Sequence, residues 1–295
     1  NMNTINISNK KMQATKPIIL SKNIFNTEGS VYDFFYRGNN KVLKVLYNTD
    51  GISFANKLYT VEMLDFYKES LPSSFVLPDN LVSIGGKISG FTIPKFNGMN
   101  FADLLDDKNV NPKEKIYYLT KIGETLNQLK SIRESGSLNK IFINDLHESN
   151  IMVNPSRKEL VFIDLDSCKI LNNGSFPSRY LGPSFFTEDK PNKYKINTNG
   201  NGYGYIVANE NSDLFCYNIM VLNYLFGAKI TRLSIDDYYD YLNYLEKLKF
   251  NKHLIDSFNK LTLTCDNTNP VNYLNSITEE QSIRAKKLVY DKVTL

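Results

Sequence analysis

The stretch IFINDLHESNIMVNPSRKELVFIDLDSCKI, residues 141–170, decides the fold of this chain. Two short runs rich in β-branched and apolar residues, 151–153 and 160–163, flank the turn-forming residues 154–158. Short apolar strands on either side of Asn, Pro and Ser are typical of a β-hairpin. The stretch therefore predicts a hairpin whose two ends return to the same place.

Oxygen-bearing side chains lie at both ends of this predicted hairpin. Asp145 and Asn150 precede its first strand, and Asp164 and Asp166 follow its second. Since a hairpin brings its ends together, three or four oxygen ligands are expected to converge there. Carboxylate and amide oxygens suit Mg²⁺, which prefers hard oxygen ligands together with phosphate.

The spacing D-x-x-x-x-N, then two strands, then I-D-x-D resembles the catalytic and metal-binding loops of the protein kinase superfamily. In that family the pattern is H-R-D-x-x-x-x-N followed by D-F-G. The resemblance implies an α+β, bilobal protein-kinase-like fold, with an antiparallel-sheet N-lobe carrying one helix and a mainly helical C-lobe. It also implies ATP and Mg²⁺ as ligands, with Asn150 and Asp164 holding the metal and Asp145 receiving or orienting the acceptor hydroxyl.

The region before residue 94 reads as strands with one helix. Strands are predicted at 17–25, 30–36, 41–46, 81–84 and 90–93, with a helix over 53–70. Alternation along the third strand places Val42, Lys44 and Leu46 on one face, and a buried lysine there needs a charged partner. Val-Leu-Lys-Val at 42–45 resembles the V-A-I-K of the third kinase strand, and the resemblance implies that Glu62 on the helix pairs with Lys44.

The loop at 26–30 would cover the phosphates of a nucleotide, although it has one glycine where the kinase pattern has three. The resemblance implies that Val31, Val42 and Met152 sandwich the adenine. The expected ATP-binding residues are Gly29, Val31, Val42, Lys44, Met152 and His147.

The composition of the chain changes from strand-rich to helix-rich within 94–99. The predicted lobes are 17–96 and 97–295, and the polar segment 1–16 is expected to be flexible. A helix is predicted over 111–134, with Pro112 in its first turn.

The chain is irregular after Asp166, where the family has its activation segment, and Glu188 resembles the glutamate that closes that segment. A helix capped by Ser212 or Asp213 follows and ends at Gly227. In the family, an aspartate at the position of Asp213 holds the backbone of the catalytic loop, so a structural role is implied for it.

Three departures from the kinase pattern bear on function. Ile143-Asn144 replaces His-Arg, so regulation by phosphorylation of the activation segment is not expected. His147, in D-L-H-x-x-N, resembles small-molecule phosphotransferases such as aminoglycoside and choline kinases, and either contacts the γ-phosphate or is an ordinary loop residue. Asp166 replaces the glycine of D-F-G and is either a second metal ligand or a capping residue, with capping favoured.

Composition narrows the environment of the protein. The chain has 295 residues, three cysteines and a net charge of +4. The cysteines are far apart and odd in number, which favours a reducing, cytoplasmic location. We find no apolar run long enough to span a membrane and no concentrated basic patch that predicts nucleic-acid binding.

The sequence thus predicts an ATP- and Mg²⁺-dependent phosphotransferase, with a protein Ser/Thr hydroxyl favoured as acceptor over a small molecule. A pseudokinase that serves as a binding scaffold, and nucleotidyl transfer on the same fold, are the alternatives.

Overall fold

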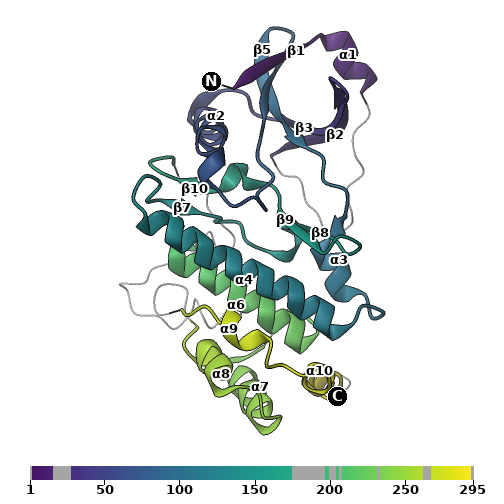
Figure 1. Cartoon of the computed structure of the whole chain (residues 1–295), viewed down its shortest axis with the longest axis vertical. Helices are drawn as coiled ribbons and strands as arrows, with labels where there is room; N and C mark the ends of the chain where they lie inside the picture. Colours follow the sequence, from purple (N-terminus) through teal and green to yellow (C-terminus); the bar gives the residue numbers. More distant parts are fainter. Residues whose placement is uncertain are drawn as a thin grey trace. The chain divides into compact units, whose positions relative to one another are not determined.

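The computed structural model describes most of the chain, with gaps. The described residues are 2–15, 28–174, 197–198, 204–205, 208–230, 233–261 and 267–293. The chain divides into two compact units (Figure 1). The first comprises Asn1–Ala102, Ile132–Ile141 and Ser149–Gly174, and the second Asp103–Ser131, Phe142–Glu148 and Ser175–Leu295. The fold class is α+β, as predicted. The predicted strand at 17–25 and the position of Glu188 lie outside the described residues.

A five-stranded mixed sheet forms the centre of the first unit (Figure 1). Its strands, in spatial order, are β1 (Asn3–Ile7), β4 (Asn80–Ile84), β5 (Lys87–Pro94), β3 (Asn39–Leu46) and β2 (Gly29–Tyr36). β1 pairs with β4 in parallel, and the other neighbours are antiparallel. The four antiparallel strands are those that the sequence predicted.

Tight turns fix the register of the two hairpins. Arg37 and Gly38 connect β2 to β3 with φ of 48° and 80°, and Gly85 and Gly86 connect β4 to β5 with φ of 59° and 88°. Two consecutive residues with positive φ make a turn whose twist matches that of the strands. Glycine adopts this conformation readily, which explains why the sequence has glycine at both turns.

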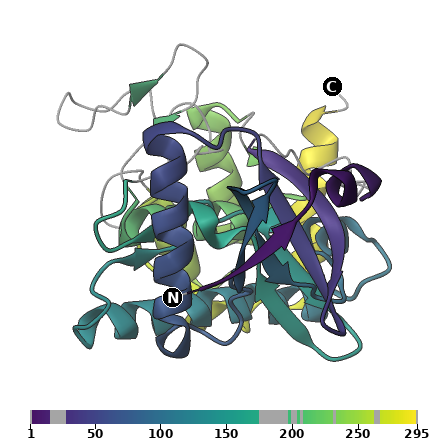
Figure 2. The same cartoon turned by 90° about the horizontal axis from the view of Figure 1, so that it is seen from above.

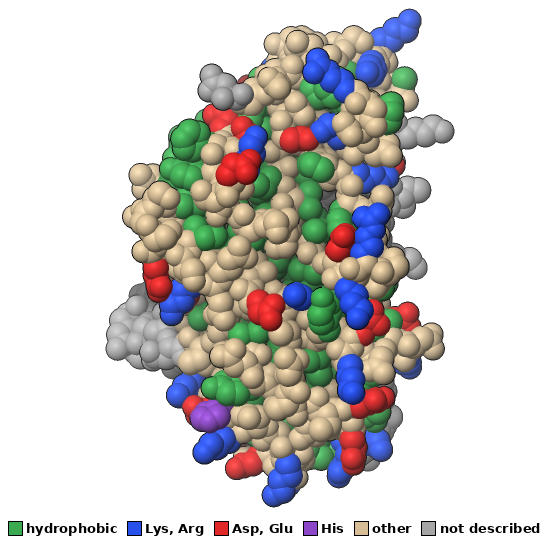
Figure 3. All heavy atoms as spheres, in the orientation of Figure 1, with side chains coloured by type: hydrophobic (Ala, Val, Ile, Leu, Met, Phe, Trp, Pro, Cys, Tyr) green, Lys and Arg blue, Asp and Glu red, His purple; other side chains and the backbone are tan. Residues whose placement is uncertain are grey.

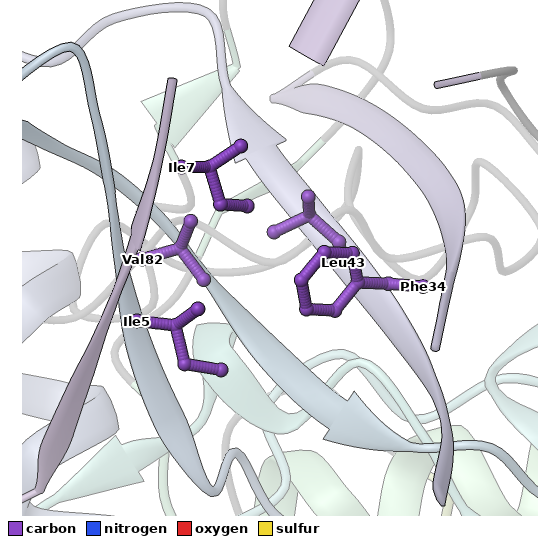
Figure 4. Close-up of a cluster of buried hydrophobic side chains, with 5 residues drawn as sticks. All are labelled: Ile5, Ile7, Phe34, Leu43 and Val82. Atoms are coloured by element: carbon purple, nitrogen blue, oxygen red, sulfur yellow. The ribbon is translucent and has the colours of Figure 1, made fainter. Parts of the chain in front are cut away.

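The N-terminal segment was expected to be flexible, and no regular structure was predicted there, but residues 3–14 contain a strand and a helix. They form β1 and the helix α1 (Asn9–Ala14). Ile5 and Ile7 of β1 point into a cluster of buried side chains with Phe34, Leu43 and Val82 (Figure 4). Burying an isoleucine contributes about 1.5–3 kcal/mol, which offsets part of the cost of ordering this short polar segment.

The helix α2 (Gly51–Phe66) packs on the opposite face of the sheet, beside which it stands in Figure 2. Its Val61 lies in a second buried cluster with Leu46, Leu81 and Phe91. Leu43 belongs to the first cluster and Leu46 to the second, so side chains alternate between the two faces along β3, as predicted.

The predicted hairpin of the deciding stretch is confirmed. β8 (Ile151–Asn154) pairs antiparallel with β9 (Glu159–Phe162), with Ile151 opposite Phe162. The remaining short elements of this unit are β6 (Met99–Asn100), β10 (Lys169–Ile170) and the 3₁₀ turns η1 (Lys68–Ser70) and η3 (Leu165–Ser167). Two more, β7 (Ile141–Phe142) and η2 (Glu148–Asn150), lie at the boundaries between the units.

The second unit is mainly helical. Its described elements are α3 (Phe101–Asp106), α4 (Pro112–Glu134), β11 (Asn197–Thr198), β12 (Gly204–Tyr205), α6 (Glu210–Phe226), α7 (Ile235–Lys247), α8 (Lys252–Asn259), α9 (Val271–Leu274) and α10 (Glu279–Val293). The first two residues of α3 and the last three of α4 belong to the first unit. α4 and α6 approach closely at Gly123, where a Cβ atom would lie 2.5 Å from Tyr217 Oη. The hydroxyl of Tyr217 donates a 2.7 Å hydrogen bond to the carbonyl of Leu119.

The N-cap of α6 lies earlier than predicted. Asn209 accepts a hydrogen bond from the backbone N–H of Ser212, whose hydroxyl accepts one from the N–H of Asn209. This reciprocal capping box uses Ser212 as the third helical residue rather than as the cap. The helix ends as predicted at Gly227, with φ of 79°.

The charge distribution and the helices can be compared with what nucleic acids and membranes require. Basic and acidic side chains are interspersed over the face drawn in Figure 3, in keeping with the small net charge of +4. Within the part of the chain that the structure describes, every helix is too short or too polar to cross a membrane.

Candidate functional site

Lys44 of β3 is the centre of a charged cluster in the first unit. Lys44 is 4% exposed and lies opposite Val31 of β2 and Phe91 of β5. Its Nζ contacts three carboxylates, at 2.7 Å from Asp164 Oδ1, 2.9 Å from Asp166 Oδ2 and 3.5 Å from Glu28 Oε2. An isolated ammonium would be costly to bury here, and the three carboxylates compensate its charge.

The ion pair expected between Lys44 and Glu62 is not formed, so this part of the prediction is wrong. Glu62 lies on α2 as predicted, but its side chain faces solvent. The turn of α2 that faces the cluster carries Lys57, which is 4% exposed. Helix α2 therefore contributes a positive charge where the resemblance implied a negative one.

Lys57 shares its carboxylate partners with Lys44. Lys57 Nζ lies 2.9 Å from Asp166 Oδ2 and 2.8 Å from Glu28 Oε2, and it donates to Ser167 Oγ at 3.3 Å. Each of these two carboxylate oxygens thus bridges the two lysines. Sequence reasoning missed both Lys57 and Glu28. Nothing in the pattern of α2 distinguishes Lys57 from a solvent-exposed lysine.

Asp164 and Asp166 have different environments although one residue separates them. The side chain of Asp164 is 36% exposed, whereas that of Asp166 is 1% exposed. Asp164 adopts the left-handed conformation, with φ of 58° and ψ of 39°, which is uncommon for residues other than glycine. Such conformations concentrate at functional sites, where the surrounding structure maintains them.

The capping role favoured for Asp166 is not what the structure shows. Asp164 is the N-cap residue of η3, and Asp166 lies inside this turn with its carboxylate on the two lysines. The second oxygen of that carboxylate, Oδ1, is buried and has no hydrogen-bond partner among the described residues.

The electrostatics of the cluster follow from these contacts. Burial alone would lower the pKa of Lys44, but the charges of Asp164, Asp166 and Glu28 outweigh it and raise that pKa. Burial would raise the pKa of Asp166, yet the ammonium groups of Lys44 and Lys57 hold it well below its usual range. Asp166 is therefore ionised whenever the protein is folded near neutral pH.

The pKa of Asp164, unlike that of Asp166, is shifted upward. Burial raises its pKa to about 6; Lys44 opposes this rise, and the neighbouring negative charge of Asp166 adds to it. Two carboxylates that share one lysine cannot both ionise freely.

The donor set around Asp164 and Asp166 is compatible with Mg²⁺. Both are hard oxygen donors, and the buried Oδ1 of Asp166, which has no hydrogen-bond partner among the described residues, has the chemistry of a cation ligand. Asn150 precedes β8 at the same open end of the hairpin, where its carbonyl accepts a 2.9 Å hydrogen bond from the N–H of Ile163, the residue before Asp164. Among the described residues, no three His, Cys, Asp or Glu side chains are grouped to hold a metal by themselves.

The residues expected to contact the adenine also lie in the first unit. Gly29 begins β2, where a Cβ atom would lie 2.3 Å from the carbonyl oxygen of Val45, so glycine is required for the two strands to pair. Val31, Val42 and Met152 are half-buried on β2, β3 and β8.

Asp145 and His147 lie in the second unit, with His147 Nε2 3.6 Å from Asp145 Oδ1. Asp213 of α6 accepts hydrogen bonds from the backbone N–H groups of Ile143 and Asn144, at 2.9 and 3.0 Å. The predicted backbone-holding contact of Asp213 is confirmed. Asn144 has φ of 69°, so this carboxylate secures a loop with an unusual backbone conformation.

The candidate site residues of the first unit are those of the lysine–carboxylate cluster, and those of the second unit lie on the loop that Asp213 holds. We compared the sequence with known families and with curated proteins. No family model matches it, and no curated protein is similar to it.

Proposed function

We propose that this protein is an ATP- and Mg²⁺-dependent phosphotransferase. The observation that carries the proposal is the 2.7 Å contact between Lys44 Nζ on β3 and Asp164 Oδ1 after β9. In the kinase superfamily the corresponding lysine and aspartate serve the phosphates and the metal, and these two residues are 120 positions apart in this chain. Their meeting is not required by any local secondary structure.

The roles of the chain's own residues follow from their chemistry. Lys44 would bind the α- and β-phosphate oxygens, as a buried ammonium held by carboxylates is fixed in place before the nucleotide arrives. Val31, Val42 and Met152 would enclose the adenine. Mg²⁺, when bound, would neutralise charge on the phosphates, and Asp164 and Asn150 are the residues that would hold it.

Transfer would proceed to a hydroxyl group. Asp145 would orient that hydroxyl and accept its proton, a task suited to a carboxylate. The loop before Asp145 is held through Ile143 and Asn144 by Asp213. A rigid loop supports catalysis because small displacements of a reacting group are costly.

The acceptor that we favour is a Ser or Thr hydroxyl of a protein. The contact of Asp213 with the loop before Asp145 supports it, since the motif S-D on α6 resembles that of protein kinases. A small-molecule acceptor is the second candidate, favoured by the position of His147 3.6 Å from Asp145 in a D-L-H-x-x-N sequence.

The test is incubation of the full chain with γ-labelled ATP, Mg²⁺ and a generic protein acceptor. Asp164→Ala and Asp145→Ala are the test variants, and Asp33→Ala, an exposed aspartate of β2, is the matched control. We expect label on protein with the wild type and the control, and a loss of at least about 100-fold in each test variant.

The other outcomes separate the alternatives. ATP consumption that depends on a small-molecule panel would select the second candidate. Nucleotide binding without any turnover would contradict the enzyme and leave a pseudokinase scaffold. Label transferred from the α- but not the γ-phosphate would indicate nucleotidyl transfer.

A further inference from the structure

Four side chains of the first unit form a closed ring of ion pairs. Asp166 Oδ2 lies 2.9 Å from both Lys44 Nζ and Lys57 Nζ, while Glu28 Oε2 lies 3.5 Å from the first and 2.8 Å from the second. The two ammonium groups are thus bridged twice, once by an oxygen of each carboxylate.

The two bridging carboxylates differ in how they are held. The side chain of Asp166 is 1% exposed, so its removal would leave two buried ammonium groups short of compensation. The side chain of Glu28 is 37% exposed, and it stands immediately before the first residue of β2. Ion pairs open to solvent contribute little to stability, so Glu28 is the member that another anion would displace at low cost.

The lysine on α2 is held in position from both sides. Its neighbour Asn56 exchanges two hydrogen bonds with the backbone of Gly174, at 2.6 and 2.7 Å. One turn further along the helix, Thr60 Oγ1 accepts a 2.8 Å hydrogen bond from Asn173. The part of α2 that carries Lys57 is therefore held by contacts that do not involve Glu28.

We propose that Lys57 is a second phosphate-binding lysine beside Lys44, and that Glu28 occupies their shared anion site until the phosphates of a nucleotide displace it. The proposal rests on the proposed ATP-dependent function and names a binding residue that the kinase pattern does not supply. Displacement of Glu28 removes one negative charge from beside both ammonium groups, while Asp166 remains shared by the two lysines and Asp164 still contacts Lys44. The place that Glu28 vacates is the solvent-accessible side of the ring, because its side chain is 37% exposed. Asp166 then acts as a positioning residue that holds both ammonium groups.

The experiment measures the dissociation constants of ATP, ADP and adenosine for the full chain in the presence of Mg²⁺, by calorimetry. The test variants are Lys57→Gln, Lys57→Arg and Glu28→Gln. The matched controls are Lys68→Gln, an exposed lysine just beyond α2, and Glu62→Gln, an exposed glutamate on α2.

We expect Lys57→Gln to weaken ATP and ADP by about tenfold or more, since hydrogen bonds between charged groups are worth that much, and to leave adenosine unchanged. Lys57→Arg keeps the charge and should restore part of the affinity. Glu28→Gln removes the competing anion and should tighten ATP and ADP by several-fold, again without effect on adenosine. Both controls should match the wild type.

The results that would overturn the inference are distinct from those that would overturn the function. If the wild type binds ATP more tightly than adenosine, but Lys57→Gln and Glu28→Gln both match it, Lys57 is not a phosphate ligand while the proposed function stands. If neither the wild type nor Glu28→Gln binds any nucleotide, the proposed function falls as well. Should Lys57→Gln fail to fold, Glu28→Gln decides alone, and unchanged or weaker ATP binding would refute the proposal.

Discussion

The ammonium group of Lys57 and the carboxylate of Asp166 lie 2.9 Å apart, and both side chains are almost completely removed from solvent. This contact joins helix α2 to the turn after β9 within the first unit. It replaces the lysine–glutamate pair that the sequence implied, with the positive charge on the helix. A carboxylate that follows a distant hairpin therefore helps to hold α2 in position.

Replacing Asp166 should be strongly destabilising. Asp166→Ala leaves Lys44 and Lys57 buried with fewer negative charges, and breaking a buried pair on one side costs about 3–5 kcal/mol. The free energy of unfolding, measured by urea denaturation, is the readout. Glu28→Gln at the solvent-facing side of the same ring should change it by less than about 1 kcal/mol. Equal losses in the two variants would contradict the difference in burial.

The anchoring contact of Asp213 can be tested in the same way. Asp213→Ala deprives the N–H groups of Ile143 and Asn144 of their acceptor, and each unsatisfied buried group costs about 1–3 kcal/mol. Asp213→Asn keeps one acceptor oxygen and should fall between the alanine variant and the wild type. Glu246→Gln, an exposed position of α7, serves as the control. A loss below about 1 kcal/mol in Asp213→Ala would show that the loop does not depend on this carboxylate.

Stability should depend on pH through Asp164. Its pKa is raised in the folded state from 3.8 to about 6, so the folded protein binds this proton more tightly than the unfolded chain does. The resulting contribution to stability is present at low pH and is lost as the pH rises through about 6. We expect the stability of the wild type relative to Asp164→Asn to fall as the pH rises from 3.8 to about 6, between the pKa values of the unfolded and folded states, and to level off above that.

The measurement is the free energy of unfolding of both proteins at several pH values. The uncharged surface variant Asn39→Ala should show no such trend relative to the wild type, because it changes no titrating group. A relative stability that stays constant, or rises with pH, would contradict the raised pKa.

Glu62 offers a direct choice between the sequence-based expectation and the structure. Since its side chain faces solvent on α2, Glu62→Ala should alter the free energy of unfolding by less than about 0.5 kcal/mol. Nucleotide affinity should also be unchanged. A large loss of ATP binding in this variant alone would favour the lysine–glutamate pair after all.

The N-terminal strand should be essential to the first unit. Ile5→Ala removes a buried side chain from the cluster with Phe34, Leu43 and Val82, and such truncations cost about 2–5 kcal/mol. Lys10→Ala, on the exposed side of α1, should have little effect. If both variants unfold like the wild type, the segment contributes nothing to the core.

The sequence was sufficient for elements whose determinants are local. The β4–β5 turn needs Gly85 and Gly86, the helix α4 starts at Pro112, and α6 stops at Gly227, each for a backbone reason that acts within a few residues. The alternation that places Lys44 and Leu43 on opposite faces of β3 also follows from strand geometry alone.

Features that depend on distant partners were not predictable. β1 is short and mostly polar, and its two isoleucines acquire meaning only against Val82 and Leu43. In the sequence, Lys57 looks like an ordinary helix lysine, because its partner Asp166 is distant along the chain. Glu28 likewise looks like an ordinary loop residue, because the two ammonium groups that it contacts are known only from the structure. Motif order, rather than local pattern, pointed to Lys44 and Asp164 as candidate site residues and to Asp213 as a backbone-holding residue. The contact between Lys44 and Asp164 was not predicted.

The pairing of β1 with β4 also determines which strand lies at this edge of the sheet, with unpaired backbone groups. Asn3–Ile7 align with Asn80–Ile84, so β1 occupies the outer side of β4. A chain that began after this segment would expose the N–H and C=O groups of β4 as a template for another strand. β1 itself is brief and carries exposed Asn3, Thr4 and Asn6, which makes it a poor template. β1 therefore prevents edge-to-edge pairing of β4 with another chain, and recombinant forms that lack residues 3–7 should self-associate.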